Sequence, residues 1–169
     1  LPLLGKAGGQ HGTGSGRHSP DTEGRMIEIK VEGMDRLIRK FAGYPGRLKT
    51  AMGKAMWASL LILWENVPPY PAKPQGSSYD RTGTLGRSLG VMEGGGKAGK
   101  PTVYSVTGSG TQTIGQFGTN LNYAQYVIDP DRQAWMHKGR WWTMKHIKNK
   151  SVDKIKALWD EIIKKAIRD

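Results

Sequence analysis

Hydrophobic and charged residues alternate over residues 26–32 (MIEIKVE). A period of two is typical of a strand with one buried face and one exposed face. Gly33 ends this pattern. Apolar residues at helical spacing then predict a helix over residues 34–42, before the turn-forming residues 43–46 (GYPG) interrupt the run.

The longest helical pattern begins at Pro45, a residue that helices accept in their first turn, and ends at Pro68 and Pro69. One apolar stripe runs along it and comprises Leu48, Met52, Met56, Leu60, Leu63 and Val67. Trp57, Leu61 and Trp64 widen the apolar surface beyond that stripe. We therefore expect this helix to be covered on more than one side and to form the spine of the core.

Residues 68–80 (PPYPAKPQGSSYD) predict an extended connecting loop, with a proline-rich recognition segment as the alternative. Residues 102–106 and 113–117 form short runs between glycines, which predict antiparallel strands. The glycine-rich run 94–100 is predicted to be a flexible hairpin tip. It lacks the Gly-Lys-Ser/Thr ending of a phosphate-binding loop.

A second amphipathic helix is predicted from Thr143 to Arg168, with apolar residues on one side and lysines around the rest. Ser151, followed by Asp153, could cap a break near its start. The order strand, helices, strands, helix predicts an α+β fold in which a small antiparallel sheet packs against two long helices. Residues 1–25 are rich in small polar residues and predict a disordered N-terminal extension, whereas residues 26–169 predict a single domain.

The formal net charge of +12 favours a polyanionic or acidic partner, either nucleic acid or an acidic protein ring. The chain has no cysteine, which excludes disulfides, thiolate metal sites and cysteine nucleophiles. Its longest apolar run, residues 58–64, is far shorter than the roughly 20 residues needed to span a bilayer. We therefore expect no membrane partner.

Candidate catalytic chemistry is sparse. Asp129 and Asp131 are the one close carboxylate pair outside the helices and linker, and a metal-dependent nuclease could combine them with Lys138 or His137. The Asp-Pro context favours a turn instead. His137 and His146 lack a third ligand at suitable spacing for zinc. We expect no catalytic residue, no bound metal and no cofactor.

Aromatic residues cluster before the last helix, where Trp135, Trp141 and Trp142 bracket a segment with several cations. Such a cluster could stack on nucleic-acid bases. Tryptophans before a helix more often fill a core or an interface between subunits, so these three are our candidate subunit interface.

Three further segments share an order along the chain. Residues 26–41 (MIEIKVEGMDRLIRKF) join a strand to a Gly-Met-Asp helix, residues 81–89 (RTGTLGRSL) contain Thr-Gly-x-Leu-x-x-Ser, and residues 118–127 (GTNLNYAQYV) contain Gly-Thr and Tyr-Ala-x-Tyr-Val before the element 140–142 (RWW). Together they resemble the tail-component proteins of lambdoid siphophages, which include neck, tail-completion and minor-tail proteins. The positions that match the family motifs are Arg81, Thr82, Gly83, Leu85, Ser88, Gly118, Thr119, Tyr123, Ala124, Tyr126 and Val127.

The resemblance extends over nearly all of residues 26–168. The loop 128–137 departs from the family's Glu-x-Gly-Thr pattern, and residues 1–25 match nothing in the family. Physically, Thr82 could cap a short helical turn that Gly83 allows, with Leu85 and Leu89 pointing inward and Arg81 and Arg87 outside.

The resemblance implies a structural virion protein, assembled in the host cytoplasm, that oligomerises at the head–tail junction or tail end. Its partners would be copies of itself in a ring, connector or tail-tube proteins and, as a hypothesis, DNA passing through a basic lumen. The alternative is a basic nucleic-acid-binding module, which the charge and the tryptophans favour. A small nuclease that uses Asp129, Asp131 and His137 is the third hypothesis.

Overall fold

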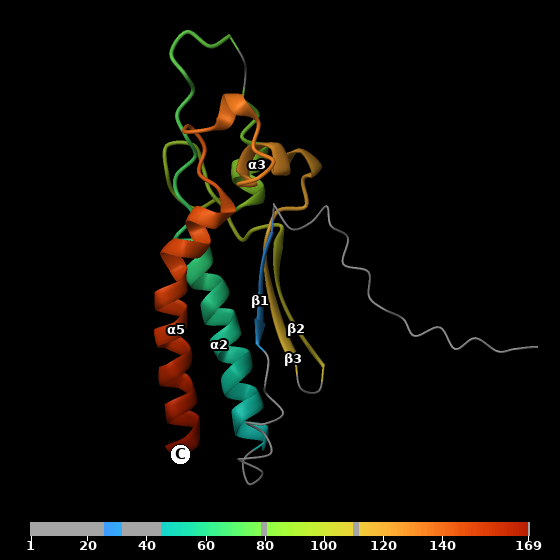
Figure 1. Ribbon diagram of the computed structural model, residues 1–169, viewed down its shortest axis with the longest axis vertical. Helices are drawn as coiled ribbons and strands as arrows, with labels where there is room; N and C mark the ends of the chain where they lie inside the picture. The colour runs from blue at the N-terminus through green and yellow to red at the C-terminus, as the bar shows by residue number, and fades with distance from the viewer. Residues whose placement is uncertain (1–25, 32–44, 79–80, 110–111, 169) are drawn as a thin grey trace, which may run out of the picture.

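The computed structural model describes residues 26–31, 45–78, 81–109 and 112–168, which form a small antiparallel sheet beside two long helices (Figure 1). The α+β fold predicted from the sequence is confirmed. The expected helix over residues 34–42 and the expected N-terminal extension over residues 1–25 lie outside the described residues.

The sheet contains β1 (Met26–Val31), β2 (Val103–Ser109) and β3 (Gln112–Gly118) in the order β1-β3-β2. Phe117 of β3 pairs with Ile27 of β1 and with Tyr104 of β2, so these three side chains share the face that is covered by the core. On the opposite face, the Gln116 amide donates to the Glu28 carboxylate at 3.2 Å. The alternation predicted for β1 is confirmed, and β2 and β3 are both longer than predicted.

The two long helices, α2 (Pro45–Glu65) and α5 (Met144–Arg168), lie side by side and run in opposite directions (Figure 1). α2 packs directly on β3, and α5 packs on α2 and touches β1. α2 is thus covered on two sides, as predicted from its wide apolar surface. Trp57 and Leu61 nevertheless remain substantially exposed, because neither the sheet nor α5 reaches them fully.

Two polar links join the helices inside this packing. The Trp159 indole N–H donates to the buried Ser59 hydroxyl at 2.9 Å, and Asn66 Nδ2 donates to the buried Ser151 hydroxyl at 3.2 Å. The break expected near Ser151 is wrong, since α5 is continuous through this residue and its hydroxyl is used in the helix contact. Two separated bonds of this kind hold the helices in one register.

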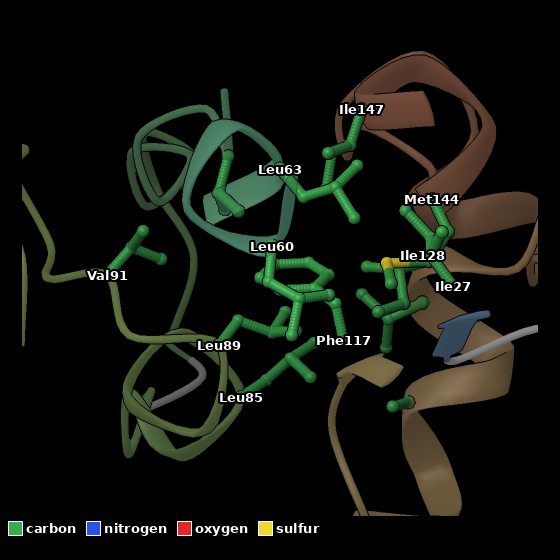
Figure 2. Packing of buried hydrophobic residues seen from close by; sticks show 13 residues of the cluster. Ile27, Leu60, Leu63, Leu85, Leu89, Val91, Phe117, Ile128, Met144 and Ile147 are labelled. Atoms are coloured by element: carbon green, nitrogen blue, oxygen red, sulfur yellow. The ribbon is translucent and has the colours of Figure 1, made fainter. Parts of the chain in front are cut away.

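The core lies where the ends of α2 and α5 meet the sheet and the short helices (Figure 2). Leu60 and Leu63 of α2 face Phe117 of β3, while Met144 and Ile147 of α5 close the cluster. At Gly115 of β3 an added Cβ would lie 2.9 Å from Met56 Cγ and 3.2 Å from Leu60 Cδ2. The absence of a side chain there allows α2 to approach the sheet closely.

The connecting segments gather beyond the end of α2 (Figure 1). They contain the short helices α3 (Thr84–Ser88), η2 (Asn122–Ala124), α4 (Gln125–Ile128) and η3 (Trp135–His137). The run 94–100 forms a tight turn that a bridge between Val91 and Lys97 closes, outside the three-stranded sheet. Lys97 Nζ donates to the carbonyl of Trp64 at 2.5 Å and so ties this turn to the end of α2.

Candidate functional site

The segment 81–89 turns sharply into α3. Gly83 stands at the N-cap with φ 66°, in the left-handed region that favours glycine. The Thr82 hydroxyl accepts from the Thr84 amide at 3.4 Å and from the Thr84 hydroxyl at 2.8 Å. The N-cap position is Gly83 rather than Thr82, although the Thr82 hydroxyl bonds to the first residue of α3, and the left-handed conformation of Gly83 provides the tight entry that the sequence predicted.

The residues of α3 divide between core and surface. Leu85 and Leu89 are buried, as predicted, and Arg87 is exposed, with its guanidinium donating to the Thr82 carbonyl at 2.6 Å. Gly86 lies against Tyr70, since a Cβ on Gly86 would lie 2.9 Å from Tyr70 Cε2. This close approach brings the proline-rich loop onto α3.

A chain of buried hydroxyls connects the two motif segments. Ser88 Oγ and Thr119 Oγ1 are 2.8 Å apart, Ser88 Oγ donates to the Leu85 carbonyl at 2.8 Å, and the Leu121 amide donates to Thr119 Oγ1 at 3.2 Å. All three bonds are satisfied together if Thr119 donates to Ser88. The segments 81–89 and 118–127, which resembled one family's motifs separately, therefore form one hydrogen-bonded unit.

The segment 118–127 buries one side and exposes the other. Ala124 and Val127 enter the core, whereas Tyr123 and Tyr126 lie on the surface. The following loop is held by Gln133, whose buried amide donates to the Val127 carbonyl at 2.7 Å and to the Trp141 carbonyl at 3.2 Å.

The same loop brings more apolar side chains beside the tyrosines. The Ala134 amide donates to the Tyr126 carbonyl at 2.8 Å, which sets η3 next to α4. The exposed fraction is 81% for Trp135, 55% for Tyr126, 49% for Met136 and 45% for Tyr123. We call these four residues the aromatic patch.

A cleft of about 640 Å³ opens beside the aromatic patch. It is lined by Tyr70, Pro74, Ser77, Arg81, Thr82, Thr84, Leu85, Tyr123, Val127, Met136, His137, Arg140 and Trp141. Tyr123 and Met136 belong to both surfaces, so the patch continues into the cleft. Five residues of the family motifs line it, together with one of the three candidate tryptophans.

Arg81 is packed into the cleft wall. Its guanidinium carbon lies 5.6 Å from the centre of the Tyr70 ring and 6.0 Å from that of the Trp141 ring, and its Nη1 donates to the Pro71 carbonyl. Tyr70 and Trp141 meet edge to face, with ring centres 4.8 Å apart. The expectation that Arg81 stays outside is wrong, because its guanidinium packs over the Tyr70 and Trp141 rings and the side chain is half-buried.

His137 shares this environment. Burial, and then the nearby charges of Arg140 and Arg81, hold the pKa of His137 below its usual value of 6.5. Both effects disfavour the imidazolium. At neutral pH the charge of the cleft therefore comes from the two arginines, with a neutral imidazole between them.

The three candidate tryptophans have different surroundings. Trp135 is the most exposed of them, whereas Trp141 and Trp142 are half-buried and pack against the core cluster. The Trp142 indole N–H donates to the Pro69 carbonyl at 3.3 Å. Of the three, Trp135 alone leaves most of its surface available to another molecule.

Of the two carboxylates proposed for a nuclease, that of Asp129 accepts hydrogen bonds from the backbone. Asp129 Oδ1 accepts from the Asp131 amide at 2.8 Å and from the Arg132 amide at 3.4 Å, which confirms the predicted turn. In the part of the chain that the structure describes, no group of three histidine, aspartate or glutamate side chains could hold a metal ion. His146 lies exposed on α5.

Several residues of the site gave no sequence signal of their own. Tyr70 lies in a loop that we predicted to be a plain connector. No sequence pattern marks Gln133 as a buried residue that joins two backbone segments through hydrogen bonds. Arg140 was noted only for its place among the tryptophans. The aromatic residue among the prolines, in residues 68–71 (PPYP), was the one feature that could have drawn attention to Tyr70.

No model of a known protein family matches the chain, and no curated protein or solved structure matches it either. Among the described residues, no helix is both long enough and apolar enough to cross a membrane.

Proposed function

We propose that the protein is a structural subunit of a tailed bacteriophage virion that assembles with copies of itself and with connector or tail-tube proteins. Assembly would take place in the host cytoplasm, at the head–tail junction or the tail end. The observation that carries the proposal is the aromatic patch, with Trp135 81% exposed. Adjacent large apolar side chains on a surface are typical of a protein–protein contact.

The sequence resemblance supports the phage setting. Two of the motif segments meet through Ser88 and Thr119, and Tyr123 and Tyr126 of the second motif belong to the aromatic patch. A ring requires each copy to offer two different surfaces that close on rotation. The patch supplies one such surface at one end of the molecule.

Solution mass tests the proposal. Light scattering over a range of concentrations, at low and high salt, should give a discrete oligomer for the full chain. Trp135→Ala should give the monomer mass at concentrations where the parent is assembled. Met92→Ala is the control, because Met92 is a large apolar residue that is 51% exposed and lies outside the aromatic patch.

Two results would count against the proposal. A parent chain that stays monomeric at every concentration, with or without a tail-tube or connector protein, would remove it. Equal oligomer masses for the parent and Trp135→Ala would show that the aromatic patch is not the contact between subunits.

A basic nucleic-acid-binding module is the second candidate function, and the surface of α5 favours it. The exposed cations of this helix are Lys145, Lys148, Lys150, Lys154, Lys156, Lys164, Lys165 and Arg168. They outnumber its three acidic residues, Asp153, Asp160 and Glu161. Such a surface attracts DNA phosphates without sequence preference.

A further inference from the structure

The cleft beside the aromatic patch has the lining of a binding site for an anionic, partly apolar segment. Its lining residues include the guanidinium cations of Arg81 and Arg140, and none of them is acidic. Leu85, Val127 and Met136 supply an apolar wall. The volume of about 640 Å³ lies within the usual range for ligand pockets.

The two arginines differ in how strongly their side chains are fixed before an anion binds. Arg81 is fixed by its two ring contacts and by the Pro71 carbonyl, so little side-chain entropy remains to be lost when it binds. Arg140 is exposed, and its side chain forms no hydrogen bond or ion pair within the described residues. One anchored and one adaptable guanidinium can share a carboxylate through charge-assisted hydrogen bonds.

Nucleic-acid bases fit this lining less well. Tyr70 is buried, its ring meets the Trp141 ring edge to face, and Arg81 lies over both rings. Base stacking needs an open aromatic face, and Tyr123 is the one aromatic residue of this lining that is substantially exposed. A carboxylate and a neighbouring aliphatic or aromatic side chain need only the arginine donors and the apolar wall.

Charge also distinguishes between protein partners. The chain carries +12, so an acidic segment is attracted to it more strongly than a neutral one. Because the aromatic patch and the cleft share Tyr123 and Met136, a chain docked on the patch can continue directly into the cleft.

We infer that the cleft binds a short acidic segment of a different protein, with a carboxylate held by Arg81 and Arg140 and the adjacent apolar side chain against Met136. This goes beyond the proposed assembly role, because it assigns a site and a ligand chemistry that do not depend on self-association.

A displayed library of random heptapeptides, selected against the immobilised full chain, tests the inference. The enriched peptides should contain aspartate or glutamate next to a large apolar residue. Arg140→Gln should weaken binding of the most enriched peptide about tenfold, as expected for the loss of a charge-assisted hydrogen bond. Lys138→Gln is the matched control and should change it by less than about twofold, because Lys138 is exposed but does not line the cleft.

The inference is overturned if the enriched peptides carry no excess of acidic residues, or if Arg140→Gln and Lys138→Gln bind the selected peptide equally well. A labelled oligodeoxythymidine that displaces the peptide, and that Arg140→Gln alone fails to bind, would assign the cleft to nucleic acid instead. Light scattering on the same samples separates the two proposals, because Arg140→Gln should leave the oligomer mass unchanged.

Discussion

At the residue scale, the contact between the two motif segments depends on the buried hydroxyls of Ser88 and Thr119. Both hydroxyls are buried, and each is satisfied by the other and by a neighbouring backbone group. A buried polar group that loses its partner keeps its desolvation cost. The two motif segments are therefore coupled through an interaction that is sensitive to the loss of one oxygen atom.

Thr119→Val removes that oxygen with little change of shape. We expect the free energy of unfolding to fall by about 1–3 kcal/mol, because Ser88 and the Leu121 amide lose a buried partner. Urea denaturation followed by circular dichroism measures the loss. Thr107→Val, on the exposed side of β2, is the control and should stay within about 0.5 kcal/mol. A loss of similar size for both variants would contradict the role given to the hydroxyl chain.

His137 gives a second residue-scale prediction. Burial, Arg140 and Arg81 hold its pKa below the usual value, so a titration followed by NMR should place the midpoint below about 6.5. Arg140→Gln removes one repelling charge and should raise the midpoint. In the unfolded chain the imidazole takes a proton more readily, so its contribution should lower the stability of the fold as the pH falls through about 6.5. A midpoint unchanged by Arg140→Gln would show that the two groups do not interact.

At the scale of elements, the contact between α2 and β3 is set by a missing side chain. Gly115 lies beneath Met56 and Leu60, so the helix lies closer to the sheet than any larger residue would allow. Gly53 lies within α2 and has nothing within 4 Å of an added Cβ. An added methyl group therefore fits at Gly53 but meets core side chains at Gly115.

Gly115→Ala should destabilise the fold by about 1–3 kcal/mol, because Met56 and Leu60 must shift from a filled core. Gly53→Ala should stabilise it by about 0.5–1 kcal/mol, since alanine restricts the unfolded chain and favours helix. Thermal unfolding of both variants should therefore move in opposite directions. A shift in the same direction would show that the packing at Gly115 can relax.

The regular elements could be predicted from sequence because their periodicity is local. The last helix was expected from Thr143 to Arg168 and begins at Met144, and the β1 alternation has the predicted buried face. The cleft could not be predicted in the same way. Tyr70 and Arg81 come from the segment between α2 and α3, and Trp141 comes from the segment before α5; neither segment has a periodic pattern, and the three residues meet only in the folded chain. The burial of Arg81 likewise depends on rings distant in sequence.

At the scale of the whole molecule, two parts can be distinguished. One part consists of the long helices and the sheet, and the other is the loop-rich end. The long helices and the strands make most of the contacts between elements. The residues of the cleft and the aromatic patch belong to the short helices and connecting segments, which gather beyond the end of α2 (Figure 1). The basic residues of α5 form a third surface on the long axis of the molecule.

DNA binding by that surface is testable through salt. We expect affinity for duplex DNA at about 50 mM salt to fall at least about tenfold by about 200 mM. The double variant Lys150→Glu/Lys154→Glu should reduce the slope of log affinity against log salt by about two. Lys49→Glu/Lys54→Glu changes the net charge equally on α2 and should have a smaller effect. Equal slopes for both variants in an anisotropy titration would show that no particular surface binds DNA.

The two polar links between α2 and α5 restrict which parts of the chain can change in length. Sliding one helix past the other by a turn would break both bonds and separate the buried Ser151 hydroxyl from Asn66 and the Trp159 indole N–H from Ser59, so other alignments are penalised. Insertions in the loop 71–78 or the loop 129–134 leave that alignment untouched. The end that carries the cleft and the aromatic patch can therefore change in length and chemistry, while the paired helices behind it keep a single alignment.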